Sequence, residues 1–398
     1  MSGLSETEAP AAPTITISSE WKEQAEEIAY GSVTAPVVVV CGAKNCGKTT
    51  FSRHLLNVLL QRYRKVAYLD TDVGQSEFTP PGCLSLTVID NLPSDLAIPC
   101  MKTPERCYFF GDTSSKRDPK AYLNCIFALY DYYSSEYRTP NERNRTLKNG
   151  LPLVVNTPGW VKGIGYDILV NMIQHMAPTH VVKINISAGN KNLPGGRFWL
   201  NGYYTMALTD AVKMKFLDEI ENQSDESVEL IEIDSARKDS SNRSILVQKD
   251  ASLLRDLKIM AYFRQIFPSN MSITTIKELA QALTSHPPYQ VPVSAVKIKH
   301  LYCQIPASEV FYSLNASIVG LAISSEDSET SPHCVGLGIV RSIDTIKQML
   351  YVLTPLPPSM VGKVDLLLQG FIQIPKCLLQ VDGRVSPYMP ANVVPSTF

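Results

Sequence analysis

One short segment constrains the fold of this chain more than any other. Residues 42–49 read Gly-Ala-Lys-Asn-Cys-Gly-Lys-Thr, which fits the pattern GxxxxGK[ST]. The segment follows an apolar run at 37–41 and opens an amphipathic stretch at 48–63, and this strand–loop–helix context is what a phosphate-binding loop requires. A chance match is rare for chains of average composition, and rarer still in that context. We therefore interpret 42–49 as a phosphate-binding loop.

The chemistry of such a loop assigns roles to its residues. Its glycines let backbone N–H groups surround phosphate oxygens, and the following helix adds its positive N-terminal end. Lys48 is expected to reach the β- and γ-phosphates, and Thr49 to ligate Mg²⁺. The candidate nucleotide-binding residues are Gly42, Ala43, Lys44, Asn45, Cys46, Gly47, Lys48, Thr49 and Thr50.

The rest of the first half alternates between short apolar runs and longer helical patterns. Strands are predicted at 37–41, 66–69, 107–110, 153–156 and 180–184, and helices at 48–63, 118–137 and 165–176. This alternation is typical of a mainly parallel sheet with helices on both faces. The predicted class is therefore α/β, of the P-loop NTPase type.

Changes in composition suggest how the chain is divided. Residues 1–20 lack a hydrophobic period and are predicted to be a flexible tail. Residues 21–288 are predicted to form the P-loop domain, with a solvated acidic insertion at 218–234 and helices at 251–267 and 273–283. Residues 289–398 are expected to form a mainly β domain, because few helical periods remain there. Its predicted strands are 291–298, 317–323, 334–340, 349–353 and 366–374.

Charge and composition exclude several classes of protein. Lys and Arg number 37 against 38 Asp and Glu, so any site for a polyanion must be a local patch. The nine cysteines contain no CxxC pair and the six histidines show no zinc spacing, which favours reduced thiols without a structural metal. The N-terminus does not resemble a signal peptide and no apolar run approaches membrane-spanning length. We expect a soluble, intracellular protein without a membrane partner.

Two carboxylates follow the predicted strand at 66–69. Asp70 and Asp72 come at the carboxyl end of that strand, where α/β proteins place their ligands. One carboxylate can hold Mg²⁺ through water and the other can accept a proton from an attacking hydroxyl. A plain acidic turn is the alternative.

Two further features have competing interpretations. Trp160 follows the strand at 153–156 and either stacks on a nucleic-acid base or packs in the core. Arg255, Lys258 and Tyr262 share one face of the predicted helix at 251–267. That face either closes over a transferring phosphoryl group or is an ordinary solvated stripe.

Taken together, the motifs resemble the polynucleotide 5′-hydroxyl-kinases, in the ribosomal-RNA-processing branch represented by nucleolar protein 9. The RNA kinase of the mRNA 3′-cleavage complex is the related branch. The matching segments are GAKNCGKTT at 42–50, DTDVGQSEF at 70–78, FFGDTSSKRDPKAYL at 109–123, NTPGWVKGIG at 156–165, LRDLKIMAYF at 254–263, and CVGLGIVRSID with YVLTPLPP toward the C-terminus. They span about 40–375.

The resemblance implies a role for each matching residue. Lys48 and Thr49 would bind ATP and Mg²⁺, Asp70 would support the metal, and Asp72 would act as the base toward a 5′-hydroxyl. Gln75 would line the same site, and Trp160 would contact the RNA end. Arg255 would be a lid arginine that stabilises the transferring phosphate. Lys258 would also contact the RNA. It stands where the cleavage-complex branch has arginine, so it keeps the charge but not the bidentate geometry.

The resemblance also implies an activity and a setting. The chain would transfer the γ-phosphate of ATP to the 5′-hydroxyl of RNA during pre-rRNA processing, in the nucleolus of the nucleus, beside the endonuclease that creates this end. The loop starts at residue 42, which leaves no room before it for the β-rich N-terminal domain that these kinases commonly carry. A GTPase is disfavoured because 190–193 read Asn-Lys-Asn-Leu, without the aspartate of Asn-Lys-x-Asp. The remaining alternative is an ATP-binding scaffold of an RNA-processing complex with little or no phosphoryl transfer.

Overall fold

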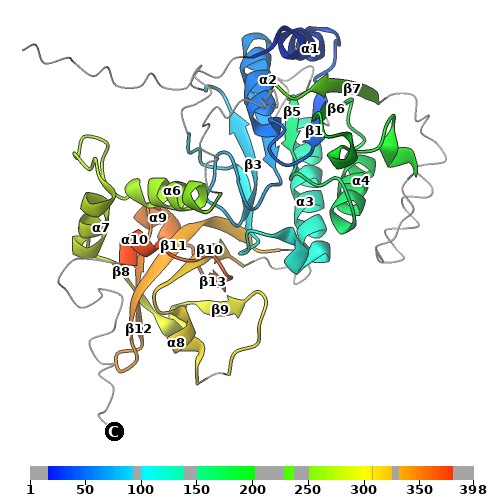
Figure 1. The fold of residues 1–398 in the computed structure, drawn as a ribbon. Coiled ribbons are helices and arrows are strands. Elements are labelled where there is room, and N and C mark those ends of the chain that lie inside the picture. The colour runs from blue at the N-terminus through cyan, green and yellow to red at the C-terminus, as the bar shows by residue number, and fades with distance from the viewer. Residues whose placement is uncertain are drawn as a thin grey trace, which may run out of the picture.

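The computed structural model describes residues 17–92, 100–138, 150–201, 228–236, 251–306, 308–324 and 331–379. These residues form two β-sheets, each with its own helices, and the predicted α/β class with a second, mainly β part is confirmed (Figure 1). None of the described helices is long and apolar enough to cross a membrane.

The first sheet contains, within the described residues, seven strands in the order β4-β3-β2-β5-β1-β6-β7. They are β1 (Val37–Gly42), β2 (Val66–Asp70), β3 (Cys83–Ile89), β4 (Arg106–Phe109), β5 (Leu153–Asn156), β6 (His180–Asn185) and β7 (Glu229–Asp234). Strands β2, β5, β1, β6 and β7 are parallel, whereas β3 pairs antiparallel with β2 and β4. The segments that follow β1, β2 and β5 therefore meet at one edge of the sheet.

Helices cover both faces of this sheet because the strand residues alternate in direction. Val38 and Val40 of β1 pack with α1 (Ser19–Tyr30) and α2 (Lys48–Arg62). Val37 and Val39 point to the other face and pack with α3 (Pro119–Tyr133) and α4 (Ile164–Met176). The uninterrupted valine run is thus a strand buried on both sides.

The second sheet has the order β8-β12-β11-β10-β13-β9 and is antiparallel except for the β13–β9 pair. Its strands are β8 (Tyr289–Pro292), β9 (Lys297–His300), β10 (Ser317–Ile323), β11 (His333–Asp344), β12 (Met349–Leu353) and β13 (Leu366–Gln369). One face packs with α6 (Ala251–Arg264), α7 (Ile276–Ser285) and α10 (Lys376–Leu379). The other face packs with α8 (Val310–Leu314), and the short α9 (Pro358–Val361) precedes β13.

The two sheets share one apolar cluster. Phe109 of β4 and Cys83 of β3 are buried together with Ile318 of β10 and with Phe263 of α6. The packing therefore groups α6 with the second sheet, although its first turn reaches the edge of the first sheet. The domain limits 21–288 and 289–398 stay a prediction from the sequence.

Some predicted elements differ from the observed ones. The acidic stretch 218–234 is not only an insertion, because its last residues form the edge strand β7, in which Ile231 and Ile233 are buried and the acidic residues are exposed. The predicted strand 291–298 is divided into β8 and β9 by a single 3₁₀ turn. Strand β3 is not predicted by the apolar pattern, since polar Ser85 and Thr87 lie buried within it.

The predicted flexible tail, residues 1–20, overlaps the first helix of the structure. Helix α1 begins at Ser19, because the side chain of Ser18 accepts a hydrogen bond from the Trp21 backbone at 3.3 Å. A serine in this position satisfies a backbone donor that would otherwise lack a partner. Residues 1–16 lie outside the described residues.

Candidate active site

The phosphate-binding loop lies between β1 and α2, as the motif predicts. Gly47 has a φ of 103°, and a Cβ atom there would lie 2.7 Å from the ring of Trp21 in α1. Only glycine suits a left-handed residue in such close contact. Trp21 is buried and donates from its indole nitrogen to the Asp234 carbonyl at 2.8 Å. Helix α1 and the end of β7 therefore support the loop from behind.

Lys48 is the first residue of α2 and is almost completely buried. Its ammonium group donates to the carbonyl oxygens of Gly42 at 3.2 Å and Ala43 at 2.8 Å. The positive charge is therefore held inside the loop, beside the N-terminus of a 15-residue helix. This arrangement fits a phosphate group, because the ammonium, the helix end and the loop N–H groups all favour an anion.

A cavity of about 450 Å³ opens at this loop. It brings together groups from five parts of the chain: the phosphate-binding loop, the segments that follow β2, β4 and β5, and the start of α6. Ten of the predicted site residues line it, namely Lys44, Asn45, Gly47, Lys48, Thr49, Thr50, Asp72, Gln75, Trp160 and Arg255. Gly42, Ala43, Cys46, Asp70 and Lys258 do not line it.

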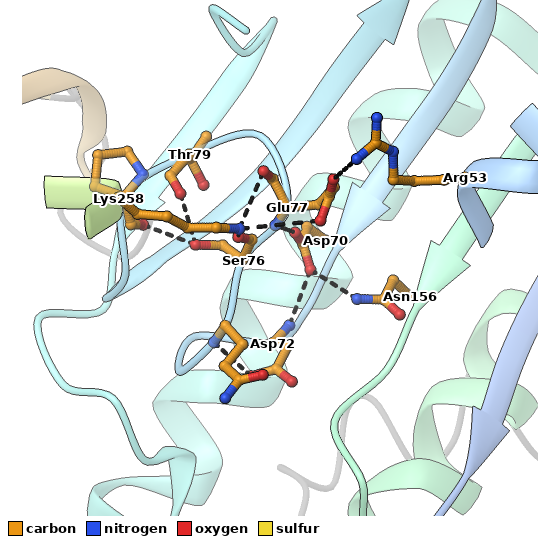
Figure 2. A network of polar contacts seen from close by, with 10 residues as sticks. Arg53, Asp70, Asp72, Ser76, Glu77, Thr79, Asn156 and Lys258 are labelled. Atoms are coloured by element: carbon orange, nitrogen blue, oxygen red, sulfur yellow. Dashed lines mark hydrogen bonds and ion pairs between the residues drawn. The ribbon is translucent and has the colours of Figure 1, made fainter. Parts of the chain in front are cut away.

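Asp70 is buried behind this cavity, with 1% of its surface exposed. One carboxylate oxygen accepts hydrogen bonds from the Asp72 N–H at 3.2 Å and the Asn156 amide at 3.3 Å, and the other accepts from the Glu77 N–H (Figure 2). Burial raises the pKa of Asp70 to about 7, even though the Glu77 N–H favours the charged form. All three hydrogen bonds that the Asp70 carboxylate accepts thus come from groups of this chain.

Asp72 differs from Asp70 because it faces the cavity. Its Oδ1 atom accepts hydrogen bonds from the N–H groups of Gly74 and Gln75, both at 3.0 Å. These bonds hold the side chain in a turn directly after β2. An aspartate held in this way can accept a proton from a hydroxyl group in the cavity.

Trp160 lines the cavity and also packs against the apolar core of the first sheet. It is partly buried, and its ring meets the ring of Tyr122 edge-on at a centroid distance of 5.4 Å. The neighbouring Gly159 lies so near the phosphate-binding loop that a Cβ atom there would be 2.5 Å from Cα of Lys44. The motif at 156–160 therefore brings an aromatic ring beside the loop, and its glycine is what allows the approach.

Helix α6 contributes Arg255 to the cavity, but Lys258 does something else. The Lys258 ammonium donates to the backbone carbonyl of Ser76 and, at 3.2 Å, to that of Glu77. It also lies 3.9 Å from the Glu77 carboxylate (Figure 2). In this structure the Lys258 charge is engaged by oxygen atoms of the chain itself, and its contact with RNA stays a prediction.

The predicted cationic face of α6 is therefore divided among three functions. Arg255 faces the cavity, Lys258 binds the segment after β2, and the Tyr262 hydroxyl accepts a hydrogen bond from the Leu337 N–H at 2.8 Å. The face is neither a plain solvated stripe nor a uniform phosphate clamp.

Sequence reasoning missed two charged residues of this region. Glu77 forms an ion pair with Arg53 of α2 at 3.2 Å, and both side chains are nearly buried. Together with Lys258 they line a neighbouring cavity of about 220 Å³ that also includes Arg255. Spacing could not reveal them, because Arg53 and Glu77 come from separate elements. Thr113, Gly74, Pro158 and Ala251 are further lining residues that the motifs did not indicate.

Among the described residues, no group of three or more His, Cys, Asp or Glu side chains is placed to hold a metal ion. The Thr49 hydroxyl and the Asp72 carboxylate are among the oxygen groups that line the cavity, and Asp70 is buried at the end of β2. These are the groups that suit Mg²⁺, which takes one or two protein ligands together with phosphate oxygens and water.

The fold and the cavity define a P-loop protein of the nucleotide-binding kinase class. Residues 42–195 match the family described as mRNA cleavage and polyadenylation factor CLP1 P-loop, and residues 284–375 match the NOL9-like C-terminal domain. The polynucleotide 5′-hydroxyl-kinase NOL9 of Arabidopsis thaliana is 56% identical over 96% of this chain and 97% of its own length. The chain therefore belongs to the polynucleotide 5′-hydroxyl-kinase NOL9 family.

More distant relatives agree with this assignment. The NOL9 kinase of Homo sapiens is 31% identical over 89% of this chain, and the chain spans about half of that protein, 52%. A structure of the wild-type Clp1p–Pcf11p complex matches 88% of this chain and 77% of its own with a TM-score of 0.56, at 17% identity. At that identity the likeness shows the fold alone.

Proposed function

We propose that this chain transfers the γ-phosphate of ATP to the 5′-hydroxyl end of RNA. The observation that carries the proposal is the lining of one cavity by Lys48, Thr49, Asp72, Trp160 and Arg255. This reaction needs a cation for the phosphates and an acceptor for the hydroxyl proton. It also needs a ring that can stack on a base and an arginine that can stabilise the transferring phosphate. The names of the family's kinases support the same activity.

Each residue has a proposed role. Lys48 would exchange its loop carbonyl partners for phosphate oxygens, and the residues 42–50 would surround the phosphates. Asp72 would accept the proton of the 5′-hydroxyl as its oxygen attacks the γ-phosphorus atom. Arg255 would stabilise the charge that develops on the transferring group. Gln75 and Trp160 would position the RNA end.

The metal site is part of the same proposal. Thr49 would hold Mg²⁺ directly, and Asp70 would act on it through water, because the Asp70 carboxylate already accepts three hydrogen bonds from this chain. When bound, Mg²⁺ supplies positive charge that neutralises the phosphates. Lys258 would contribute by fastening α6.

Pre-rRNA processing in the nucleolus, beside the endonuclease that produces the 5′-hydroxyl, belongs to this proposal. The support is the family, whose relatives are named NOL9 and GRC3. Co-purification of the tagged chain with an endonuclease that leaves 5′-hydroxyl ends, and its colocalisation with a nucleolar marker, would test these two points.

The activity is tested by transfer of labelled γ-phosphate from ATP to an RNA oligonucleotide with a 5′-hydroxyl. The same oligonucleotide with a 5′-phosphate should accept no label, and Lys48→Ala should be inactive while remaining folded. Label on the first substrate alone would support the kinase. Binding of ATP without any transfer would support the scaffold alternative instead.

A further inference from the structure

A second aromatic feature lies outside the cavity, where the two sheets meet. The rings of Tyr302 and Phe371 are nearly parallel, at an angle of 11° and a centroid distance of 5.6 Å. The guanidinium group of Arg117 lies 4.6 Å from the Phe371 centroid and 6.0 Å from that of Tyr302. We call these three residues the stacking surface.

Each residue of the stacking surface is held in place by a polar contact. Arg117 donates to the Asp112 carboxylate at 2.9 Å. The Tyr302 hydroxyl donates to the Phe110 carbonyl, and the Phe371 N–H donates to the Gly111 carbonyl at 2.6 Å. All three partners belong to the single segment 110–112, which follows β4.

This same segment leads directly into the candidate active site. Thr113 lines the active-site cavity and comes two residues after Gly111. Two residues of extended chain span at most about 7 Å. The stacking surface therefore lies within reach of an RNA chain whose 5′ end occupies the cavity.

Exposure and charge suit a nucleic-acid base better than a buried packing role. Phe371 is 48% exposed, and the Arg117 side chain is 51% exposed despite its ion pair. The exposed Lys299 lines an adjacent cavity of about 270 Å³ together with Tyr302. Asp118 lines that cavity too, but its carboxylate caps α3 by accepting from the Ala121 N–H at 2.9 Å. Of the two rings, Phe371 is exposed and Tyr302 is partly buried. An exposed ring beside cations is the kind of group that binds single-stranded RNA.

We propose that Tyr302, Phe371 and Arg117 bind a base of the RNA substrate downstream of the phosphorylated 5′ end. This inference rests on the proposed function, and it adds a second base contact to the one proposed for Trp160. The surface would raise affinity for longer RNA without taking part in phosphoryl transfer. A stack contributes similarly in the ground state and the transition state, so it should act on KM and not on kcat.

The test compares two substrates, a 5′-hydroxyl dinucleotide and a single-stranded RNA of about ten nucleotides. Phe371→Ala should raise KM for the longer RNA about tenfold, with kcat and KM for the dinucleotide and for ATP unchanged. Phe371→Trp should keep the wild-type values because it retains a ring face, whereas Phe371→Leu should behave as Phe371→Ala. Tyr312→Ala removes another exposed aromatic ring, in α8, and should have no effect.

Direct binding of the longer RNA, followed by fluorescence anisotropy, separates this inference from the proposed function. If the wild type transfers no phosphate, the proposed function fails, and the affinities of the same variants still decide on the stacking surface. Melting temperatures first establish that the variants are folded. Equal affinities and equal KM values for the wild type, Phe371→Ala and Arg117→Ala would then overturn the proposed role of the stacking surface. A tenfold loss of affinity confined to the Phe371→Ala, Phe371→Leu and Arg117→Ala variants would support it.

Discussion

Glu77 lies between two cations that come from opposite sides of the candidate active site. Its carboxylate is 3.2 Å from Nη1 of Arg53 in α2 and 3.9 Å from Nζ of Lys258 in α6. Its own N–H donates to Asp70 (Figure 2). One residue after β2 thus connects the phosphate-binding helix, the buried carboxylate and the helix that carries Arg255. The contacts with Lys258 tie α6, the helix that carries Arg255, to the segment after β2.

Glu77→Gln should destabilise the fold because it leaves two cations around a neutral, nearly buried side chain. Removing one partner of a buried ion pair typically costs about 3–5 kcal/mol. The free energy of unfolding measured in urea should therefore fall by about 3 kcal/mol. In the ion pair of Lys347 with Asp344 the lysine side chain is 71% exposed, so Lys347→Gln should cost less than about 1 kcal/mol. Similar small losses in both variants would show that Glu77 is effectively solvated.

Asp72→Asn should keep binding of ATP but lose most turnover. The amide oxygen of asparagine can still accept from the Gly74 and Gln75 N–H groups, so the turn should persist. Asparagine cannot accept the proton of the 5′-hydroxyl, so kcat should fall by about 10² to 10⁴. Single-turnover kinetics at saturating ATP and RNA measure this step. Loss of nucleotide affinity with normal turnover would instead make Asp72 a metal residue.

Arg255→Ala should lower kcat on the order of 10² with a smaller effect on ATP affinity, because its charge is needed most as phosphate is transferred. Arg255→Lys should recover part of the rate, since an ammonium group cannot make a two-pronged contact. Lys258→Ala should reduce kcat less and should also lower the melting temperature, because it releases α6 from the Ser76 and Glu77 carbonyls. Three unchanged kcat values would remove α6 from the mechanism.

Trp160→Ala should raise KM for RNA about five- to tenfold and leave KM for ATP nearly unchanged, since stacking on a base contributes about 1–3 kcal/mol. Trp160→Phe keeps a ring and should retain most of the affinity. Because Trp160 is partly buried and packs against the core, Trp160→Ala should lower the melting temperature modestly, and Trp160→Phe should lower it less. A large fall in melting temperature with normal KM for RNA would favour a packing role.

Asp70 should make the stability of the nucleotide-free protein depend on pH. Its pKa is raised from 3.8 to about 7, so the folded state binds a proton more tightly than the unfolded state does. The stabilisation is complete below the unfolded pKa and is lost as pH rises through 7. At about 1.36 kcal/mol per pKa unit, the loss is at most on the order of 4 kcal/mol.

The measurement compares the wild type with Asp70→Asn at pH 5 and pH 8, without ATP or Mg²⁺. The asparagine adds a cost of its own that does not depend on pH, because its amide must face the Glu77 N–H. The difference in unfolding free energy between the two proteins should therefore shift in favour of Asp70→Asn at the higher pH. A difference that is equal at both pH values would show that the pKa of Asp70 is not raised.

The local parts of this fold could be predicted from the amino-acid sequence. The valine run, the GxxxxGK[ST] loop and the start of α2 form one continuous segment, so pattern and turn chemistry were sufficient to predict them. Most strand ends agree within one or two residues for the same reason. The candidate residues Asp72, Trp160 and Arg255 were found because each belongs to a short motif.

How these motifs meet could not be predicted, because it depends on contacts between distant segments. Asp70 and Asp72 are two residues apart, yet one is buried and the other faces the cavity, because the chain turns away from the sheet between them. Lys258 binds Ser76 and Glu77 across 182 and 181 residues of sequence, and β7 completes the first sheet by pairing with β6. Such contacts depend on side-chain direction and burial between distant segments, which no periodicity in a single segment contains.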